Sequence, residues 1–425
     1  MKHRRPPALC LLLVLALSRS AGAAEPETPN LPPAELVARV LRASPMVQAA
    51  THQIRVEEAN RDRLVAGSYE WNLRLGSQQR RSKPATGTDE RFTEWNAAIE
   101  RPLRLPGKSA ADAELGAASV SVAETARGDA LHEGSRNLLK TWFAWLKETT
   151  AANQWREQVA LLRKQTTAIQ RRQQLGDAAR LESIQGSAAL AQAEAALAQT
   201  EVRQRIAADD LRRRFPGLPL DEPTRIATPL PVNGRIEEWV ESILEHSHEL
   251  ELARGETQIA ILQAGRSRRD RLPDPSVGLH VARERAGEDQ IVGAYISIPF
   301  PGSGRSASSA AALASAEAAG SREQAANQKI SAEAAATFHA AAAALATWQA
   351  GRAAAEQLNQ AAEMTARAYQ LGEGSLNDLL VARRLANEAE LNARLLQLEA
   401  LESRYRLMLD AHRLWVLDEE KHAND

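Results

Sequence analysis

The nineteen prolines of this 425-residue chain are absent from two long stretches, residues 107–215 and 302–425. Proline inside a helix costs about 3 kcal/mol and usually ends the helix, so a long stretch without it can form one continuous helix. Both stretches are rich in alanine, glutamine, glutamate, arginine and leucine, which are strong helix formers. Only 4% of the residues are aromatic, too few to fill several ordinary enzyme cores. The chain is therefore expected to be mainly α-helical.

Apolar residues recur every seven positions in both stretches. The clearest series in the first stretch is Leu131, Leu138, Trp145, Ala152 and Val159, and in the second it is Leu391, Leu398 and Tyr405. A seven-residue period is typical of helices that pack along a coiled-coil-like seam. We expect long helices at 109–173 and 305–370, each roughly 100 Å long at about 1.5 Å per residue.

Short segments with apolar residues at alternate positions lie upstream of each long helix. This alternation predicts two strand pairs, the first at about 69–79 and 92–101, the second at about 275–284 and 290–299. Each pair ends in a proline and glycine segment and then opens into a long helix. The fold class expected is mainly α with a small β part.

The sequence contains an internal duplication. Pro102 and Pro299 are separated by almost the same number of residues as Gly176 and Gly372. Agreement between independent proline and glycine positions is informative because alanine-rich and glutamate-rich sequence matches itself by chance. We expect a first repeat at 24–215, a proline-rich linker at 216–235 and a second repeat at 236–425.

The N-terminus has the pattern of an export signal. Basic residues precede an apolar run that ends before Ala21-Gly22-Ala23, so residues 1–23 are expected to be a cleaved signal peptide that carries the single cysteine, Cys10. The chain has 53 Lys plus Arg against 54 Asp plus Glu. With the basic residues interleaved with acids, nucleic acid is not an expected partner.

Four strands are too few to close a barrel, and open strand edges are not tolerated in lipid. Three copies would supply about twelve strands, enough for a water-filled pore. On this hypothesis the chain is a homotrimer in contact with membrane lipid. The membrane-interface aromatics would be Tyr69, Trp71, Trp95 and Tyr295. The alternative, equally compatible with the alternation, is that these residues form the core of a small soluble sheet.

Several short motifs resemble those of TolC-like outer-membrane efflux channels, also called outer-membrane factors. The helix-opening Ser44-Pro45-Met46 and Ser247-His248-Glu249-Leu250 are similar to the family's Asn-Pro-x-Leu. The segments Glu100-Arg101-Pro102-Leu103 and Ser297-Ile298-Pro299-Phe300 resemble its strand-ending signatures. The tip motif, a glycine followed six residues later by an acid, is matched by Gly176 with Glu182 and by Gly372 with Asp378.

This resemblance implies a homotrimer with an outer-membrane β-barrel and a long periplasmic α-barrel. It implies a passive channel that receives cargo from a periplasmic adaptor (a membrane fusion protein) and an inner-membrane pump, with an RND-type pump as one candidate. The segment Pro106-Gly107-Lys108-Ser109 is nearest to the Gly-Gly-Lys-Arg stretch of CzcC-like heavy-metal efflux channels, which makes metal ions a candidate cargo. Its serine and its single glycine depart from that pattern.

The ends of the long helices are the expected adaptor-facing mouth. Gly176 and Gly372 are the expected tip turns because glycine readily adopts the left-handed conformation that ends a helix. The candidate gate acids are Asp177, Glu182, Glu373 and Asp378. The competing interpretation is that acids after a turn merely stabilise the N-terminus of the next helix.

Catalytic signatures are weak, and we expect no enzyme activity, cofactor or metal site. His246 and His248 are spaced by two, whereas a helical zinc site usually uses a spacing of four. Gly107-Lys108-Ser109 resembles the end of a phosphate-binding loop, but Pro102 occupies the position where that motif needs glycine. The alternatives to a channel are a soluble periplasmic coiled-coil scaffold or adaptor protein and, less favoured, an exported helical hydrolase.

Overall fold

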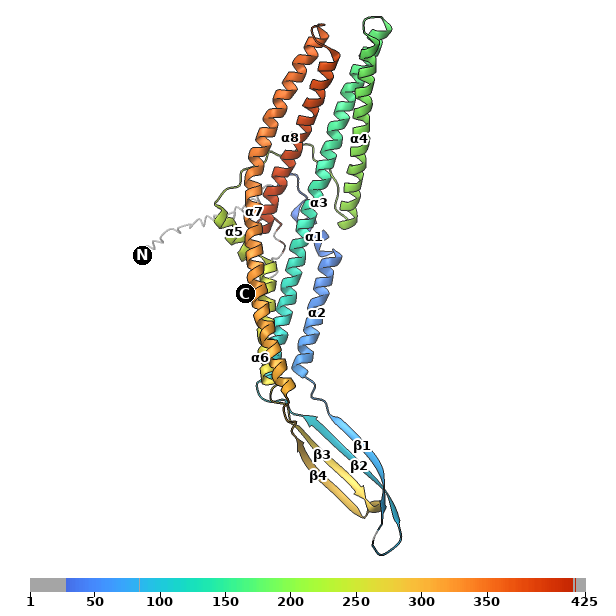
Figure 1. Ribbon diagram of the computed structural model, residues 1–425, viewed down its shortest axis with the longest axis vertical. Helices are drawn as coiled ribbons and strands as arrows, with labels where there is room; N and C mark the ends of the chain where they lie inside the picture. Colours follow the sequence, from blue (N-terminus) through green and yellow to red (C-terminus); the bar gives the residue numbers. More distant parts are fainter. Residues whose placement is uncertain (1–27, 84, 416, 418–425) are drawn as a thin grey trace, which may run out of the picture.

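The computed structural model describes residues 28–83, 85–415 and 417, which form a long rod (Figure 1). A small sheet occupies one end of the rod, and two long helical hairpins end at the other. The expected signal peptide at 1–23 lies outside the described residues, as does Cys10.

The elements follow one another in the same order in the two halves of the chain. The first half contains α1 (Ala34–Arg42), α2 (Pro45–Ala66), β1 (Asn72–Ser82), β2 (Glu90–Pro102), α3 (Lys108–Gln174) and α4 (Arg180–Arg214). The second contains α5 (Ile236–Glu245), α6 (His248–Arg269), β3 (Ser276–Glu284), the short 3-10 helix η1 (Arg285–Gly287), β4 (Asp289–Ser297), α7 (Ser303–Gln370) and α8 (Leu376–Asp410). Corresponding helices match in length, with 22 residues in both α2 and α6 and 35 in both α4 and α8.

Equivalent serines begin the corresponding helices α2 and α6. The hydroxyl of Ser44 accepts a hydrogen bond from the Val47 N–H, and that of Ser247 accepts one from the Leu250 N–H. These bonds satisfy backbone donors that have no partner in the first turn. Serine is therefore the N-cap residue at both helix-opening motifs.

The four strands form one antiparallel sheet in the order β1-β2-β3-β4. The first strand begins at Asn72, three residues later than the sequence predicts. Tyr69 lies outside it because the Arg101 Nε donates to the Tyr69 carbonyl at 2.8 Å and the Tyr69 hydroxyl donates to Asp274 at 2.9 Å. These contacts tie Tyr69 to the junction between sheet and helices instead of to the strand ladder.

The main hydrophobic core lies in the middle of the rod, where α3 packs against α8. All five residues of the first heptad series are buried, as are Leu398 and Tyr405 on α8. The hydroxyl of Tyr405 donates to the Pro29 carbonyl at 2.9 Å, and the Trp142 Nε1–H donates to the Asn30 carbonyl at 2.7 Å. Burial raises the pKa of Tyr405 to about 12. The hydrogen bonds to the Pro29 and Asn30 carbonyls therefore hold the chain segment before α1 against this core.

Candidate functional site

One face of the sheet is apolar and exposed. The register places Leu73, Ile99, Leu279 and Ala294 side by side in one row, and Leu75, Ala97, Val281 and Val292 in the next. The exposed fractions of Leu73, Leu279 and Val292 are 67%, 60% and 82%. A continuous apolar face of this kind is uncommon on a monomeric soluble protein and usually marks a surface that another apolar phase covers.

The opposite face of the same sheet is polar and internally paired. Arg80 contacts both Glu94, at 3.1 Å, and Glu284, at 2.7 Å, and the Gln78 amide donates to Glu94 at 2.9 Å. Nearer the helices, the Tyr295 hydroxyl donates to Glu100 at 2.9 Å. The sheet thus has one apolar face and one face of paired polar and charged side chains.

The two outer strands, β1 and β4, each pair on one side only among the described residues. Unpaired strand edges expose backbone N–H and C=O groups and are absent from lipid-exposed structures unless a barrel closes. Among the described residues, the sheet therefore has two open edges beside its exposed apolar face.

The four aromatic residues expected at a membrane interface have different surroundings. Trp71 and Trp95 are exposed by 59% and 46%; the register places Trp95 on the apolar face, whereas Trp71 immediately precedes β1. The Arg101 guanidinium lies 5.5 Å from the centre of the Trp71 ring. Tyr69 is at the junction, and the register places Tyr295 opposite Gly278 on the polar face. Of the four aromatic residues, the register therefore places Trp95 on the exposed apolar face and Tyr295 on the opposite one.

Both helical hairpins turn at the glycines that the sequence singles out. Gly176 has φ +85° and Gly372 has φ +79°. In the first turn the Asp177 N–H donates to the Arg172 carbonyl, and in the second the Glu373 N–H donates to the Ala368 carbonyl. Together with the bonds from the two glycine N–H groups, these are Schellman motifs, which need a left-handed residue at the turn.

The four candidate acids near the turns have three different surroundings. Asp177 and Glu373 are exposed at the turns. The backbone N–H of Asp378 donates to the Ser375 hydroxyl, which in turn donates to the Asp378 carboxylate at 2.7 Å. Asp378 therefore stabilises the start of α8, as the competing interpretation of the sequence proposes.

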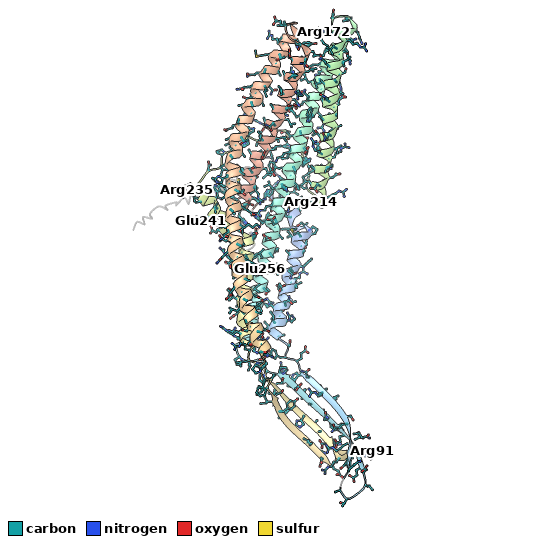
Figure 2. The ribbon with its side chains drawn as sticks, viewed as in Figure 1. Arg91, Arg172, Arg214, Arg235, Glu241 and Glu256 are labelled. Carbon is teal, nitrogen blue, oxygen red and sulfur yellow. The ribbon has the colours of Figure 1, made fainter. Side chains whose placement is uncertain are left out.

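Glu182 makes a contact between the two hairpins. Its carboxylate accepts a hydrogen bond from the Tyr369 hydroxyl at 2.8 Å, and Arg172 donates to the same hydroxyl at 3.2 Å. Burial and the bond to Glu182 raise the pKa of Tyr369. Figure 2 shows Arg172 at this end of the rod and Arg91 at the far end of the sheet. Sequence reasoning identifies Glu182 but misses Arg172, because nothing in a helical arginine marks its partner on another helix.

Large apolar side chains are exposed around the two turns. Leu175, Leu181 and Ile184 are exposed by 63%, 62% and 57%, and Leu371 by 67%. The ends of both hairpins therefore present leucines beside exposed acids, a mixed surface suited to contact with another protein.

A buried ionic network joins the sheet to the helices. Lys108 is 2% exposed, and its ammonium lies 3.0 Å from carboxylate oxygens of both Asp270 and Asp274 and 2.8 Å from the Leu272 carbonyl. Burial by itself raises the pKa of Asp274, but hydrogen bonds from the Leu105 N–H and the Lys108 ammonium outweigh it and hold that pKa below its usual range. Lys108 therefore links segments that are far apart in sequence.

Asp112 forms the second half of this junction. It is 4% exposed and lies 2.9 Å from an Arg104 nitrogen and 2.6 Å from the Arg266 Nε. Arg266 also pairs with Asp270, which connects the two halves of the network. The network thus fixes the position of the long helix α3 relative to α6 and the strand ends.

Among the described residues, no helix is both long enough and apolar enough to cross a membrane. Within the same residues, no group of three or more His, Cys, Asp or Glu side chains is placed to bind a metal ion. His246 and His248 lie at the junction of α5 and α6.

The fold is that of TolC-like outer-membrane channels, mostly helical with a small antiparallel sheet. The CmeC outer membrane channel of Campylobacter jejuni matches with a TM-score of 0.72 at 14% identity, over 97% of this chain and 94% of that chain. A membrane protein from Pseudomonas aeruginosa matches with a TM-score of 0.70 at 16% identity, over 89% and 92%. The outer membrane protein VceC of Vibrio cholerae matches with a TM-score of 0.63 at 18% identity, over 88% and 95%.

No protein-family model matches the chain, and no curated protein sequence matches it. At identities of 14 to 18% the structural matches establish the fold.

Proposed function

We propose that this protein is the outer-membrane channel of a tripartite efflux system and conducts cargo passively. The observation that carries the proposal is the two-sided sheet, with exposed apolar rows on one face, paired charges on the other and two open edges. Three copies would close such sheets into a barrel with lipid outside and water inside. The shared fold with outer-membrane channels supports the same function.

The proposed protein partners are inferred from the end of the rod where the two helical hairpins turn, opposite the sheet. A periplasmic adaptor would dock on the tip turns Gly176 and Gly372, where Leu175 and Leu371 are exposed. An inner-membrane pump would supply the cargo through that adaptor. An RND-type pump is a candidate from the family resemblance, and metal-ion cargo is a candidate from the resemblance of residues 106–109 to CzcC-like channels. Lys108 of that motif is buried in the junction network, so its side chain is not available to cargo.

Cell fractionation tests the proposal against a soluble scaffold or adaptor. The full-length protein should be recovered in the outer-membrane fraction and released only by detergent, as a species whose gel mobility changes on heating. Recovery of most of the protein in the soluble periplasmic fraction without detergent would reject the channel and favour the scaffold.

The bond between Tyr369 and Glu182 is proposed to hold the periplasmic mouth closed. It joins the two hairpins, so the mouth can widen by hairpin separation only if this bond breaks. We expect Tyr369→Phe, which removes the hydroxyl and keeps the ring, to raise the open probability of single channels in planar bilayers several-fold. An unchanged open probability for Tyr369→Phe would contradict the proposal that the bond to Glu182 holds the mouth closed.

The exposed acids Asp177 and Glu373 would form a ring at this mouth. Their neutralisation should weaken the block of the channel by multivalent cations.

The tip turns are expected to tolerate valine poorly for a backbone reason alone. No atom lies within 4 Å of a Cβ added at Gly176 or Gly372, so the cost arises from the left-handed φ and is about 1 to 2 kcal/mol per turn. The double Val variant should still reach the outer membrane but lose efflux-dependent resistance. Gly217→Val is the matched control, because Gly217 also has a positive φ and open space around its Cα but lies in the linker. Equal resistance in both variants would argue against adaptor docking at the tips.

A further inference from the structure

The charged residues of the four strands are divided between the two faces of the sheet. Side chains alternate between the faces along a strand, and residues opposite each other in an antiparallel pair share a face. The register therefore places every strand carboxylate on the polar face, namely Glu90, Glu94, Glu100, Glu284 and Asp289. Four of the six strand arginines lie on the apolar face, namely Arg81, Arg91, Arg101 and Arg283. Within the strands, the apolar face thus carries positive charge and no negative charge.

Three of these arginines lie toward the end of the sheet that is farthest from the helices. Arg81 and Arg91 are directly opposite each other in the register, and Arg283 is opposite Trp95. Figure 2 shows Arg91 at this end of the molecule. All three side chains are exposed. We call Arg81, Arg91 and Arg283 the arginine band.

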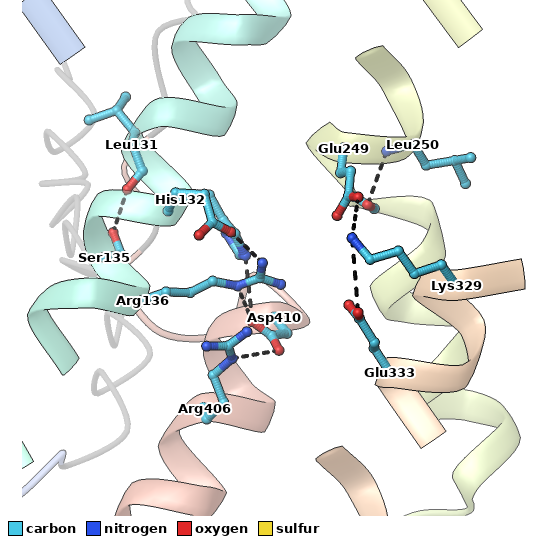
Figure 3. A network of polar contacts seen from close by, with 12 residues as sticks. Leu131, His132, Ser135, Arg136, Glu249, Leu250, Lys329, Glu333, Arg406 and Asp410 are labelled. Carbon is cyan, nitrogen blue, oxygen red and sulfur yellow. Dashed lines mark hydrogen bonds and ion pairs between the residues drawn. The ribbon is translucent and has the colours of Figure 1, made fainter. Parts of the chain in front are cut away.

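Arginines on the polar face and in the helical part of the rod are balanced within the chain. Arg74, on the polar face of β1, lies 3.5 Å from Glu100. Figure 3 shows Arg136 of α3 and Arg406 of α8 converging on Asp410 in the middle of the rod. These guanidinium groups therefore have carboxylate partners within the same chain.

The arginine band has fewer partners of this kind. Arg81 pairs with Asp89 in the loop between β1 and β2. Within the part of the chain that the structure describes, the side chains of Arg91 and Arg283 form no ion pair or hydrogen bond. Like charges directly opposite each other in a sheet are destabilising, as for Arg81 and Arg91. Three arginines and one carboxylate leave two positive charges for an anion from outside the chain.

The position of the arginine band indicates which anion this is. Val281 belongs to the last apolar row, and Arg283 follows it on the same face with Trp95 opposite. Tryptophan at the boundary between apolar and charged residues is typical of a membrane–water interface. The guanidinium group matches phosphate in geometry and charge, and basic side chains at a membrane surface attract anionic lipid headgroups. Arg91 lies four residues beyond Trp95, about 14 Å along the strand, so the arginine band spans the depth of a headgroup layer.

We propose that the arginine band binds the phosphate groups of anionic lipids in the membrane leaflet farthest from the helices. This inference rests on the proposed function, because it requires the apolar face of the sheet to lie in lipid. Arg91 and Arg283 contact the phosphates, and Trp95 lies where the headgroups meet the acyl chains. In a barrel of three copies the arginine band recurs three times around the outer surface.

Native mass spectrometry of the full-length protein, released from detergent micelles, tests this site. The probes are phosphatidylglycerol, which is anionic, and phosphatidylcholine with the same acyl chains, which has no net charge. One basic residue at a membrane surface strengthens the binding of an anionic lipid about fivefold. We expect the wild type to bind phosphatidylglycerol at least about fivefold more than phosphatidylcholine, and the double variant Arg91→Gln with Arg283→Gln less than about twofold more.

The control is Arg74→Gln, which removes an exposed arginine from the polar face and should keep the wild-type preference. If the double variant does not assemble, Arg91→Gln alone gives the comparison. An equal preference in the wild type and the arginine-band variant, or no preference in the wild type, would overturn the proposal. Displacement of phosphatidylglycerol from the wild type by excess inorganic phosphate would overturn it in favour of a site for free phosphate.

Failure of this inference can be distinguished from failure of the proposed function. A wild-type protein that conducts ions in bilayers but shows no lipid preference would reject only the arginine band. A protein that is soluble without detergent and binds neither lipid would reject the channel and the arginine band together.

Discussion

Replacing Lys108 with methionine is expected to destabilise the protein by about 1 to 3 kcal/mol. Methionine fills a similar volume, but it leaves the carboxylates of Asp270 and Asp274 facing each other without the buried ammonium between them. Asp270 keeps its pair with Arg266 and is partly exposed, so the cost arises mainly at Asp274, which loses the ammonium. The free energy of unfolding in guanidinium chloride, measured on detergent-solubilised protein, checks the prediction.

The matched control for Lys108→Met is Lys140→Met, because Lys140 is exposed on the same helix. Its effect should lie within about 0.5 kcal/mol of zero. If the two variants unfold at the same denaturant concentration, the junction network does not fix the sheet to the helices. The comparison also tests whether the lysine of the Pro106-Gly107-Lys108-Ser109 motif has a structural role in this chain.

Leu279→Arg and Leu73→Arg are expected to abolish accumulation in the outer membrane. Both leucines lie in the same row of the exposed apolar face, and an arginine on the lipid-facing side of a β-barrel costs about 2 to 4 kcal/mol near the bilayer midplane. In an oligomer this cost is repeated in every copy. Immunoblots of separated outer-membrane and soluble fractions measure the result.

The control for Leu279→Arg is His280→Arg at the adjacent position. The register places His280 on the polar face, where it is opposite Ala98 and Gly293. A charged side chain there would face water inside the proposed barrel, so assembly should continue. Normal assembly of both leucine variants would contradict a lipid-facing sheet and support the small soluble sheet that the alternation alone also permits.

The long helices and their buried seam could be predicted from sequence because those signals are local. The absence of proline defines the helices, and the heptad positions from Leu131 to Val159 are buried as the period indicates. The two-sided nature of β1 is also readable from Leu73 and Leu75, which alternate with polar residues.

The face occupied by Tyr295 could not be predicted from its own strand. Residues 291–296 are apolar or glycine at almost every position, so no apolar-polar alternation shows which of them lie on which face of the sheet. The register of its pairing with β3 determines which residues of β4 lie on each face, and it places the Tyr295 hydroxyl beside Glu100 on the polar face. An alternating sequence pattern assigns residues to the two faces of a strand only where one face is polar and the other apolar.

The junction network and the approach of four histidines to one another depend on contacts between distant parts of the chain. Lys108 meets Asp270 and Asp274 more than 160 residues later in the sequence. Spacing predicts a helical ligand pair but cannot show that His132 and His412 approach His246 and His248 in space. Composition and motif spacing therefore define the rod, while its polar contacts require the fold.

Single-channel recording in planar lipid bilayers tests the channel function most directly. Purified full-length protein, reconstituted without any partner, should produce discrete conductance steps, with more frequent or longer openings in the Tyr369→Phe variant. Each step should come from a detergent-stable trimer that dissociates on heating. A protein that is monomeric without detergent, and that produces no conductance as wild type or as Tyr369→Phe, would contradict the proposal that this rod is an outer-membrane channel.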